Sequence, residues 1–213
     1  GPQQFVGILH DFGLNNPDID RNATPVLSLG PCEVSVGEMV SAYTAFANGG
    51  VRCAPLFVTK IEDSHGNVIA KFQPLMTEVI SEDNSYRMID MMRAVIDGGT
   101  GSRLKGAYGM KGDICGKTGT TNSNSDGWFI AFTPELVSGA WVGGEDRDIH
   151  FDSTSLGQGA AAALPIWAYF MKKVYADHQL GYSDKPQFAI PKDFDFCSTS
   201  EDTDVNDIQE VYF

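Results

Sequence analysis

The stretch from residue 112 to residue 144 constrains the fold more than any other part of the chain. It contains three strand-like runs, at 113–121, 128–133 and 136–142, and the first ends in β-branched threonines. A polar loop of Asn and Ser joins the first two runs, and the dipeptide Pro134-Glu135 joins the last two. Connections this short join neighbouring strands that run in opposite directions. The stretch therefore predicts an antiparallel meander of three strands.

Most of the remaining chain shows apolar residues at helical spacing, and one segment shows a hairpin pattern. Helices are predicted over 3–12, 36–47, 85–97 and 160–175, and a hairpin within 56–72. Connecting loops are expected at 15–31, 100–112 and 151–159. A capping box, Ser35-Val36-Gly37-Glu38, marks the start of the second helix. The order of elements predicts an α+β fold in which helices cover an antiparallel sheet.

The apolar stripes of these helices are interpreted as core packing, because amphipathic helices bury their apolar face. The residues expected inside are Val36, Met39, Val40, Tyr43, Phe46 and Ala47 in the second helix, Tyr86, Ile89, Met92, Val95 and Ile96 in the third, and Trp167, Phe170, Met171 and Val174 in the last. The interpretation places no cofactor on these faces.

Length and composition predict one folded domain with a polar tail. The chain has 213 residues, and its 42% hydrophobic content is enough for a sizeable core. We place the domain at 1–176 and a polar, acidic tail at 177–213. The net charge of −13 argues against binding to nucleic acid or to an anionic membrane surface. No stretch approaches the roughly 20 apolar residues of a membrane-spanning helix.

The cysteines and histidines carry no metal-binding pattern. Cys32, Cys53, Cys115 and Cys197 form no C-x-x-C pair, and His10, His65, His150 and His178 share no ligand spacing. Free thiols are favoured over disulfides, whose pairing the sequence does not define. We expect no metal site and no cofactor.

The chemistry of the chain is concentrated at Lys117-Thr118-Gly119-Thr120. Glycine within a strand lets a ligand or another backbone approach closely, and the neighbouring residues add two hydroxyls and a cation. An edge strand equipped in this way can pair with an extended peptide and hold its carboxylate. Alternation along a strand puts Lys117 and Gly119 on one face and the threonines on the other. Both sets reach one ligand only if it lies along the strand edge.

Four segments resemble the penicillin-binding transpeptidases, within the serine active-site group that uses Lys-Thr-Gly as one of three motifs. The segments are LSLGPCEVSVGEMVSAYTAFANGG, VIDGGTGSRL, GKTGTTNSNSDGWFIAFTPELVSGAWVGG and AAALPIWAYFM. The resemblance is closest to the bifunctional class A proteins. It implies the C-terminal part of a penicillin-binding, β-lactamase-like transpeptidase fold, and an enzyme that cross-links peptidoglycan stem peptides ending in D-Ala-D-Ala. It also implies β-lactams as inhibitors and a location on the extracytoplasmic face of the bacterial inner membrane.

The resemblance assigns roles to the motif residues. Lys117 corresponds to the lysine that lowers the cost of negative charge near the nucleophile and assists proton transfer. Thr118 and Thr120 correspond to the hydroxyls that bind the carboxylate of the stem peptide or β-lactam. The backbone N–H of Thr120 corresponds to one of two oxyanion-hole donors, and Gly119 keeps the strand open. The next two aromatic residues, Trp128 and Phe129, are expected to pack in the sheet.

Two of the family's three motifs are missing. The chain contains no Ser-x-Asn, and its one Ser-x-x-Lys, from Ser102 to Lys105, lies in a Gly-rich stretch that matches a family segment unrelated to the nucleophile. The chain is therefore expected to begin after both motifs, without the glycosyltransferase domain and membrane anchor of class A proteins. It carries no nucleophile and is expected to be inactive alone.

Two alternative functions stay open, and the missing segment has one further consequence. Lys-Thr-Gly is shared with D,D-carboxypeptidases and β-lactamases, in which water replaces the acceptor amine. The missing serine also allows a non-catalytic peptide-binding module on the same scaffold. Because the family buries the nucleophile's helix against this sheet, the chain alone is expected to expose an apolar face and to self-associate.

Overall fold

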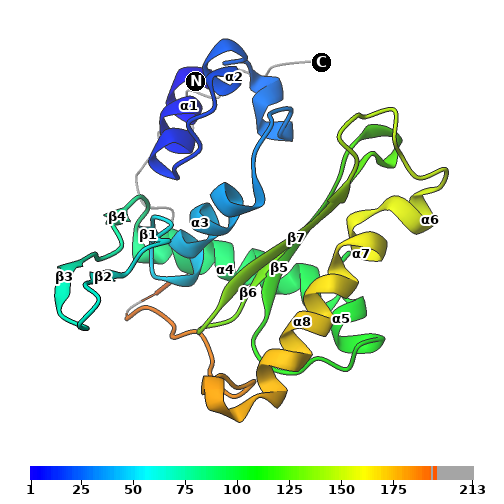
Figure 1. Cartoon of the computed structure of the whole chain (residues 1–213). Helices are drawn as coiled ribbons and strands as arrows, with labels where there is room; N and C mark the ends of the chain where they lie inside the picture. Colours follow the sequence, from blue (N-terminus) through cyan, green and yellow to red (C-terminus); the bar gives the residue numbers. More distant parts are fainter. Residues whose placement is uncertain (193, 196–213) are drawn as a thin grey trace.

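A three-stranded antiparallel sheet lies at the centre of the computed structural model, which describes residues 1–192 and 194–195 (Figure 1). Its strands are β5 (Cys115–Thr120), β6 (Asp126–Phe132) and β7 (Val137–Gly143), in the order β5-β6-β7. The register places Lys117 opposite Ile130 and Trp128 opposite Trp141. The predicted meander and the predicted α+β class are both confirmed.

One face of the sheet is covered by helices from the C-terminal half of the chain. These are α5 (Arg103–Gly106), α7 (Gly159–Ala162) and α8 (Leu164–Ala176), together with the end of α4 (Glu82–Asp97). Phe129 of β6 meets Trp167 of α8 edge to face, with ring centroids 5.7 Å apart. Both side chains are fully buried, so this contact forms the centre of the larger core.

The opposite face is covered by α3 (Val36–Ala47) and the first turns of α4. Cys115 and Phe132 of the sheet are buried there against Tyr86, Ile89 and Met92 of α4. The side chains of Tyr43 and Phe46 are half-buried against this cluster. The most buried residues of α3 are the small Ser41, Ala42 and Ala45 rather than the predicted aromatic stripe, because α3 packs closely against β1 and α4.

The N-terminal segment forms a small cluster of its own. It contains α1 (Pro2–Asp11), α2 (Pro17–Arg21) and the 3-10 helix η1 (Pro25–Leu29), which enclose Ile19 and Leu27. The prediction of a loop over 15–31 is wrong at both short helices. Asn16 accepts a hydrogen bond from the Asp18 N–H, so Asn and Pro act here as helix-start residues rather than as breakers.

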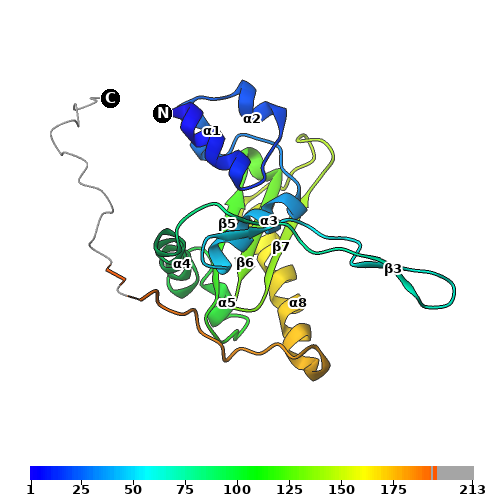
Figure 2. The same ribbon diagram turned by 90° about the vertical axis from the view of Figure 1, so that its left-hand side faces the viewer.

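Two further strand pairs lie beside α3. Strand β1 (Val51–Cys53) pairs with β4 (Met76–Glu78), and β2 (Lys60–Glu62) pairs with β3 (Val68–Lys71). The β2–β3 hairpin extends away from the body of the molecule (Figure 2). It confirms the predicted hairpin, with shorter strands.

Three sequence predictions about helices are corrected. Helix α4 begins at Glu82, because Ser81 caps it by accepting from the Asn84 N–H. Short helices α5 and α6 (Thr154–Gly157) occupy part of the predicted loops 100–112 and 151–159. The predicted single helix 160–175 is divided at Ala163 into α7 and α8, because Pro165 has no N–H to continue the helical ladder.

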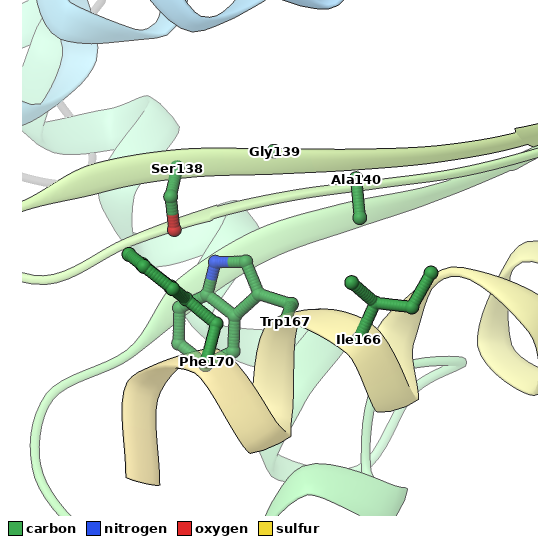
Figure 3. A pocket seen from close by; sticks show the side chains of 6 residues that line it. All are labelled: Ser138, Gly139, Ala140, Ile166, Trp167 and Phe170. Carbon is green, nitrogen blue, oxygen red and sulfur yellow. The ribbon is translucent and has the colours of Figure 1, made fainter. Parts of the chain in front are cut away.

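The prediction that Phe170 is buried is wrong, because its side chain is 46% exposed. The buried stripe of α8 passes through Leu164, Trp167, Ala168, Met171 and Val174. Phe170 lies beside this stripe with Ile166, and both side chains border a hollow between α8 and β7 (Figure 3).

After α8 and the 3-10 helix η3 (His178–Leu180), the C-terminal segment packs back onto the domain. The ring of Phe188 lies 5.6 Å from that of Phe132, and the ring of Phe194 lies 4.9 Å from that of Tyr86. The first part of the predicted tail therefore contributes to the core. Residues 196–213, which carry much of the tail's acid, lie outside the described residues.

The described cysteines, Cys32, Cys53 and Cys115, are free thiols, whereas Cys197 lies outside the described residues. Burial raises the pKa of Cys115 to about 12. Within residues 1–192 and 194–195, no three His, Cys, Asp or Glu side chains are grouped as metal ligands. No helix in that part of the chain is long and apolar enough to cross a membrane.

Candidate functional site

The Lys117–Thr120 motif lies on an open edge of the central sheet, because no described strand pairs with β5 on the side away from β6. The Thr121 N–H donates to the Asp126 carbonyl at 3.1 Å, so these two residues form a hydrogen-bonded pair. Pairs in an antiparallel ladder alternate, which makes Thr118 and Thr120 non-hydrogen-bonded positions. Their backbone N–H and C=O groups therefore face away from β6, toward the open edge.

Lys117 is exposed, and its side chain turns toward the same edge. Its Nζ donates to the Thr118 carbonyl oxygen at 2.7 Å. Strand alternation places the Cβ of Lys117 on the face opposite Thr118, but the long side chain brings the ammonium group back to the edge. A ligand lying along β5 can thus meet the ammonium group and the hydroxyls together.

The hydroxyls of Thr118 and Thr120 have partners outside the motif. Thr118 Oγ1 lies 2.7 Å from Thr100 Oγ1, in the loop between α4 and α5. Thr120 Oγ1 accepts a hydrogen bond from the Gly159 N–H, at the start of α7, at 3.1 Å. Because the Thr120 oxygen accepts this bond, its own proton remains available to a ligand.

Two of these neighbours, Thr100 and Gly159, were not identified by sequence reasoning. Position 159 has no room for a side chain. An added Cβ would lie 3.1 Å from the Trp128 amide nitrogen and closer still to the carbonyl oxygens of Trp128 and Gly119. Thr100 lies within the segment VIDGGTGSRL, whose match to the transpeptidases was the one available signal. Gly159 stands in an ordinary Gln-Gly-Ala context and gave no signal.

The aromatic pair after the motif packs in the sheet. The ring of Trp128 lies 6.3 Å from that of Trp141 on β7, and Phe129 is fully buried against Trp167. At the end of β5, Thr121 Oγ1 and Trp141 Nε1 each donate to the carboxylate of Asp126 at 2.9 Å. These bonds hold the end of the motif strand to the rest of the sheet.

The Ser-x-x-Lys sequence from Ser102 to Lys105 is not arranged as a catalytic pair. Lys105 Nζ donates to the carboxylate of Asp97, and Ser102 begins the one-turn helix α5. Activation of a serine nucleophile needs a base within hydrogen-bond reach. The ammonium group is instead directed at an aspartate.

Two hollows lie away from the motif. One, of about 210 Å³, is lined by Ser138, Gly139, Ala140, Ile166, Trp167 and Phe170 (Figure 3), and the other, of about 220 Å³, is lined by Ser125, Val142, Gly143, Gly144, Ile149, His150 and Phe151. Neither of these two hollows is lined by residues 117–120, which lie along the open edge of β5.

The sequence profile of the penicillin-binding protein transpeptidase domain matches residues 1–142. The chain belongs to this family. It is 39% identical over 151 residues to penicillin-binding protein 1A of Aquifex aeolicus, covering 70% of this chain and 20% of that protein. It is 36% identical over 179 residues to penicillin-binding protein 1A of Neisseria lactamica, covering 80% of this chain and 21% of that protein. The chain thus spans about a fifth of the length of these relatives.

Solved structures of penicillin-binding proteins share the fold. Penicillin-binding protein 1A from Haemophilus influenzae superposes with a TM-score of 0.75 at 25% identity, covering 90% of this chain and 32% of that chain. PonA1 from Mycobacterium tuberculosis superposes with a TM-score of 0.73 at 25% identity, covering 91% and 53%. The resemblance to class A penicillin-binding transpeptidases, drawn from the sequence, is confirmed.

Proposed function

We propose that this chain supplies the Lys-Thr-Gly half of the active site of a peptidoglycan D,D-transpeptidase, within a longer penicillin-binding protein on the extracytoplasmic face of the inner membrane. The observation that carries the proposal is the open edge of β5. One ammonium group and two hydroxyls converge there beside outward-facing backbone amides. Residues 1–176 are the domain portion, and 177–213 are its C-terminal extension.

The motif residues divide the work between binding and charge stabilisation. The hydroxyls of Thr118 and Thr120 donate to the terminal carboxylate of a D-Ala-D-Ala stem peptide or of a β-lactam. The Thr120 N–H, which faces the open edge, donates to the oxyanion of the tetrahedral intermediate. The Lys117 ammonium group stabilises negative charge as the nucleophile's proton is transferred.

The nucleophile must come from another part of the longer protein. In the proposed reaction a serine hydroxyl attacks the penultimate D-alanine carbonyl, and the last D-alanine leaves. The acyl group then passes to the amine of a neighbouring peptide. Because Lys105 is paired with Asp97, it does not serve Ser102 as an activating base, and we expect this chain to be inactive alone.

Two other functions share part of this geometry. A D,D-carboxypeptidase or β-lactamase-type hydrolase uses the same motif with water as the acceptor. A non-catalytic module would bind the peptide without acylation. The match to penicillin-binding protein 1A sequences favours the transpeptidase, and one solved relative, PonA1, is recorded in complex with penicillin V. Product analysis with an amine acceptor separates transfer from hydrolysis.

A labelled β-lactam tests the proposal directly. The 213-residue chain and the longer protein are incubated with a fluorescent penicillin, and adducts are read by intact mass and peptide mapping. We expect no adduct on the chain alone and one adduct on the longer protein, at a serine outside residues 1–213. An adduct at Ser102 would contradict the assignment of the nucleophile, and no adduct on either protein would contradict the proposed reaction.

A further inference from the structure

The loop between α4 and α5 brings a third hydroxyl to the edge of β5. Thr100 Oγ1 lies 2.7 Å from Thr118 Oγ1, although the two residues are 18 positions apart in the sequence. This distance is typical of a hydrogen bond between two hydroxyls. Thr100 therefore contacts the proposed carboxylate site without belonging to its strand.

The backbone of the loop is held on both sides of Thr100, whose own side chain is exposed. The fully buried side chains of Ile96 and Leu104 fix it on both sides in the main core. The Gly101 N–H donates to the Val95 carbonyl at 3.0 Å, and the Ser102 N–H donates to the Gly99 carbonyl at 3.1 Å.

The two glycines that flank Thr100 are required by close packing. An added Cβ at Gly99 would lie 2.8 Å from the Val95 Cα, and one at Gly101 would lie 2.6 Å from Ile96 Cδ1. Backbone atoms of Val95 leave no room for a side chain at position 99, and the fully buried Ile96 side chain restricts position 101. The Gly-Thr-Gly sequence thus fits the tight turn that presents Thr100 to β5.

A bound anion would fix which of the two hydroxyls donates in the hydrogen bond between Thr100 and Thr118. Each hydroxyl has one proton to donate and two lone pairs that accept. A carboxylate only accepts hydrogen bonds, so the Thr118 hydroxyl must donate its single proton to the ligand. The Thr118 oxygen then accepts from Thr100, and bonds arranged in such a chain strengthen one another.

We propose that Thr100 is a positioning residue that orients the Thr118 hydroxyl to donate to the carboxylate of the substrate or β-lactam. The proposal rests on the proposed function of Thr118 and extends it by one residue. It predicts that the contribution of Thr100 depends on an anionic group in the ligand. A ligand whose carboxylate is esterified gains much less from the oriented hydroxyl, because charge-assisted hydrogen bonds are about twice as strong as neutral ones.

The test uses the longer protein and compares two ligands, benzylpenicillin and its methyl ester. Thr100→Val removes the hydroxyl and keeps the side-chain shape, whereas Thr100→Ser keeps the hydroxyl. We expect Thr100→Val to lower the second-order rate of acylation by benzylpenicillin about three- to tenfold, the range for one hydrogen bond. Acylation by the methyl ester is expected to change less than twofold, and Thr100→Ser is expected to restore the benzylpenicillin rate.

Further variants separate a positioning role from a structural one. In the double variant with Thr118→Val, adding Thr100→Val should cause no further loss, because the two hydroxyls act as a unit. Ser102→Ala, which changes a neighbouring hydroxyl of the same loop, should leave both rates unchanged. The melting temperature of every variant is recorded alongside.

The outcomes distinguish this inference from the function on which it rests. An unchanged benzylpenicillin rate in Thr100→Val, or an equal loss with both ligands, overturns the role of Thr100. If Thr118→Val lowers the benzylpenicillin rate while Thr100→Val does not, the carboxylate site stands and only the positioning role fails. If Thr118→Val has no effect, both fail together.

Discussion

Arg93 and Asp113 form a two-pronged ion pair immediately before the motif strand, with Nε and Nη2 at 2.8 and 3.0 Å from the two carboxylate oxygens. The Phe188 N–H donates to the same carboxylate at 3.0 Å. The pair thus joins α4, the entry to β5 and the C-terminal segment. It fixes the strand four residues before Lys117.

Asp113→Asn should destabilise the domain by about 3 kcal/mol, because it leaves the Arg93 guanidinium group without its buried partner. Thermal or denaturant unfolding of the longer protein measures the loss. Asp90→Asn is the matched control, since Asp90 also pairs with Arg93 but its side chain is 48% exposed. The control should cost less than about 1 kcal/mol. Equal losses in the two variants would contradict a special role for Asp113.

The same pair predicts how stability depends on pH. Burial alone would raise the pKa of Asp113, but hydrogen bonds from Arg93 and from the Phe188 N–H outweigh it and lower the pKa. A carboxyl group with a lowered pKa in the folded state stabilises the fold above its unfolded pKa of about 3.9, and this contribution is lost as pH falls through the folded value. Wild-type protein should therefore lose more stability than Asp113→Asn on acidification below about pH 4. An equal loss of stability in the wild type and in Asp113→Asn as the pH falls would contradict this prediction.

Lys117→Ala in the longer protein should lower the acylation rate with benzylpenicillin by about two to three orders of magnitude, because the developing negative charge loses its nearby cation. The side chain is exposed and donates its hydrogen bond to a backbone carbonyl, so the melting temperature should change little. Stopped-flow acylation and thermal unfolding are measured on the same sample. A collapse of the melting temperature would make Lys117 structural, and an unchanged rate would remove its catalytic role.

Gly159→Ala should displace α7 from the sheet, since the added methyl group meets the backbone of β5 and β6. We expect a destabilisation of about 2–3 kcal/mol, as for other overpacked sites, and loss of the bond to Thr120. Gly106→Ala is the control, because a Cβ there meets nothing within 4 Å. It should be neutral or slightly stabilising. A Gly159 variant as stable as this control would show that the contact tolerates a side chain.

The 213-residue chain alone should self-associate along β7. This strand has no charged side chain, and its outer edge pairs with no described strand. Beside it lie the exposed Ile166 and Phe170. The buried Trp167 Nε1 also lies there, and it has no hydrogen-bond partner among the described residues. Exposed apolar edges of this kind promote association.

Sedimentation at several concentrations tests this association. Phe170→Lys should shift the chain toward monomer, because it places a charge at the rim of the hollow. Phe57→Lys should not, although Phe57 is 94% exposed, because it lies near the separate β2–β3 hairpin. A wild-type monomer at all concentrations, or equal effects of the two variants, would contradict association through β7.

The meander and the Lys117–Thr120 motif can be predicted from the amino-acid sequence, because both depend on local information. Short connections leave neighbouring strands only one way to pair, and β-branched residues with a central glycine define the motif strand. The match to the transpeptidases extended this local pattern to a family.

Which distant residues complete the motif, and which apolar side chains stay exposed, depends on how the helices pack against the sheet. Thr100 reaches Thr118 across 18 residues, and Gly159 reaches Thr120 across 39, through the packing of α4 and α7 against the sheet. Phe170 follows a helical spacing that suits burial, yet no described strand lies beyond β7, and Phe170 is 46% exposed. The periodicity of apolar residues predicts which face of a helix is apolar, but only the packing of the helices on the sheet determines what that face contacts.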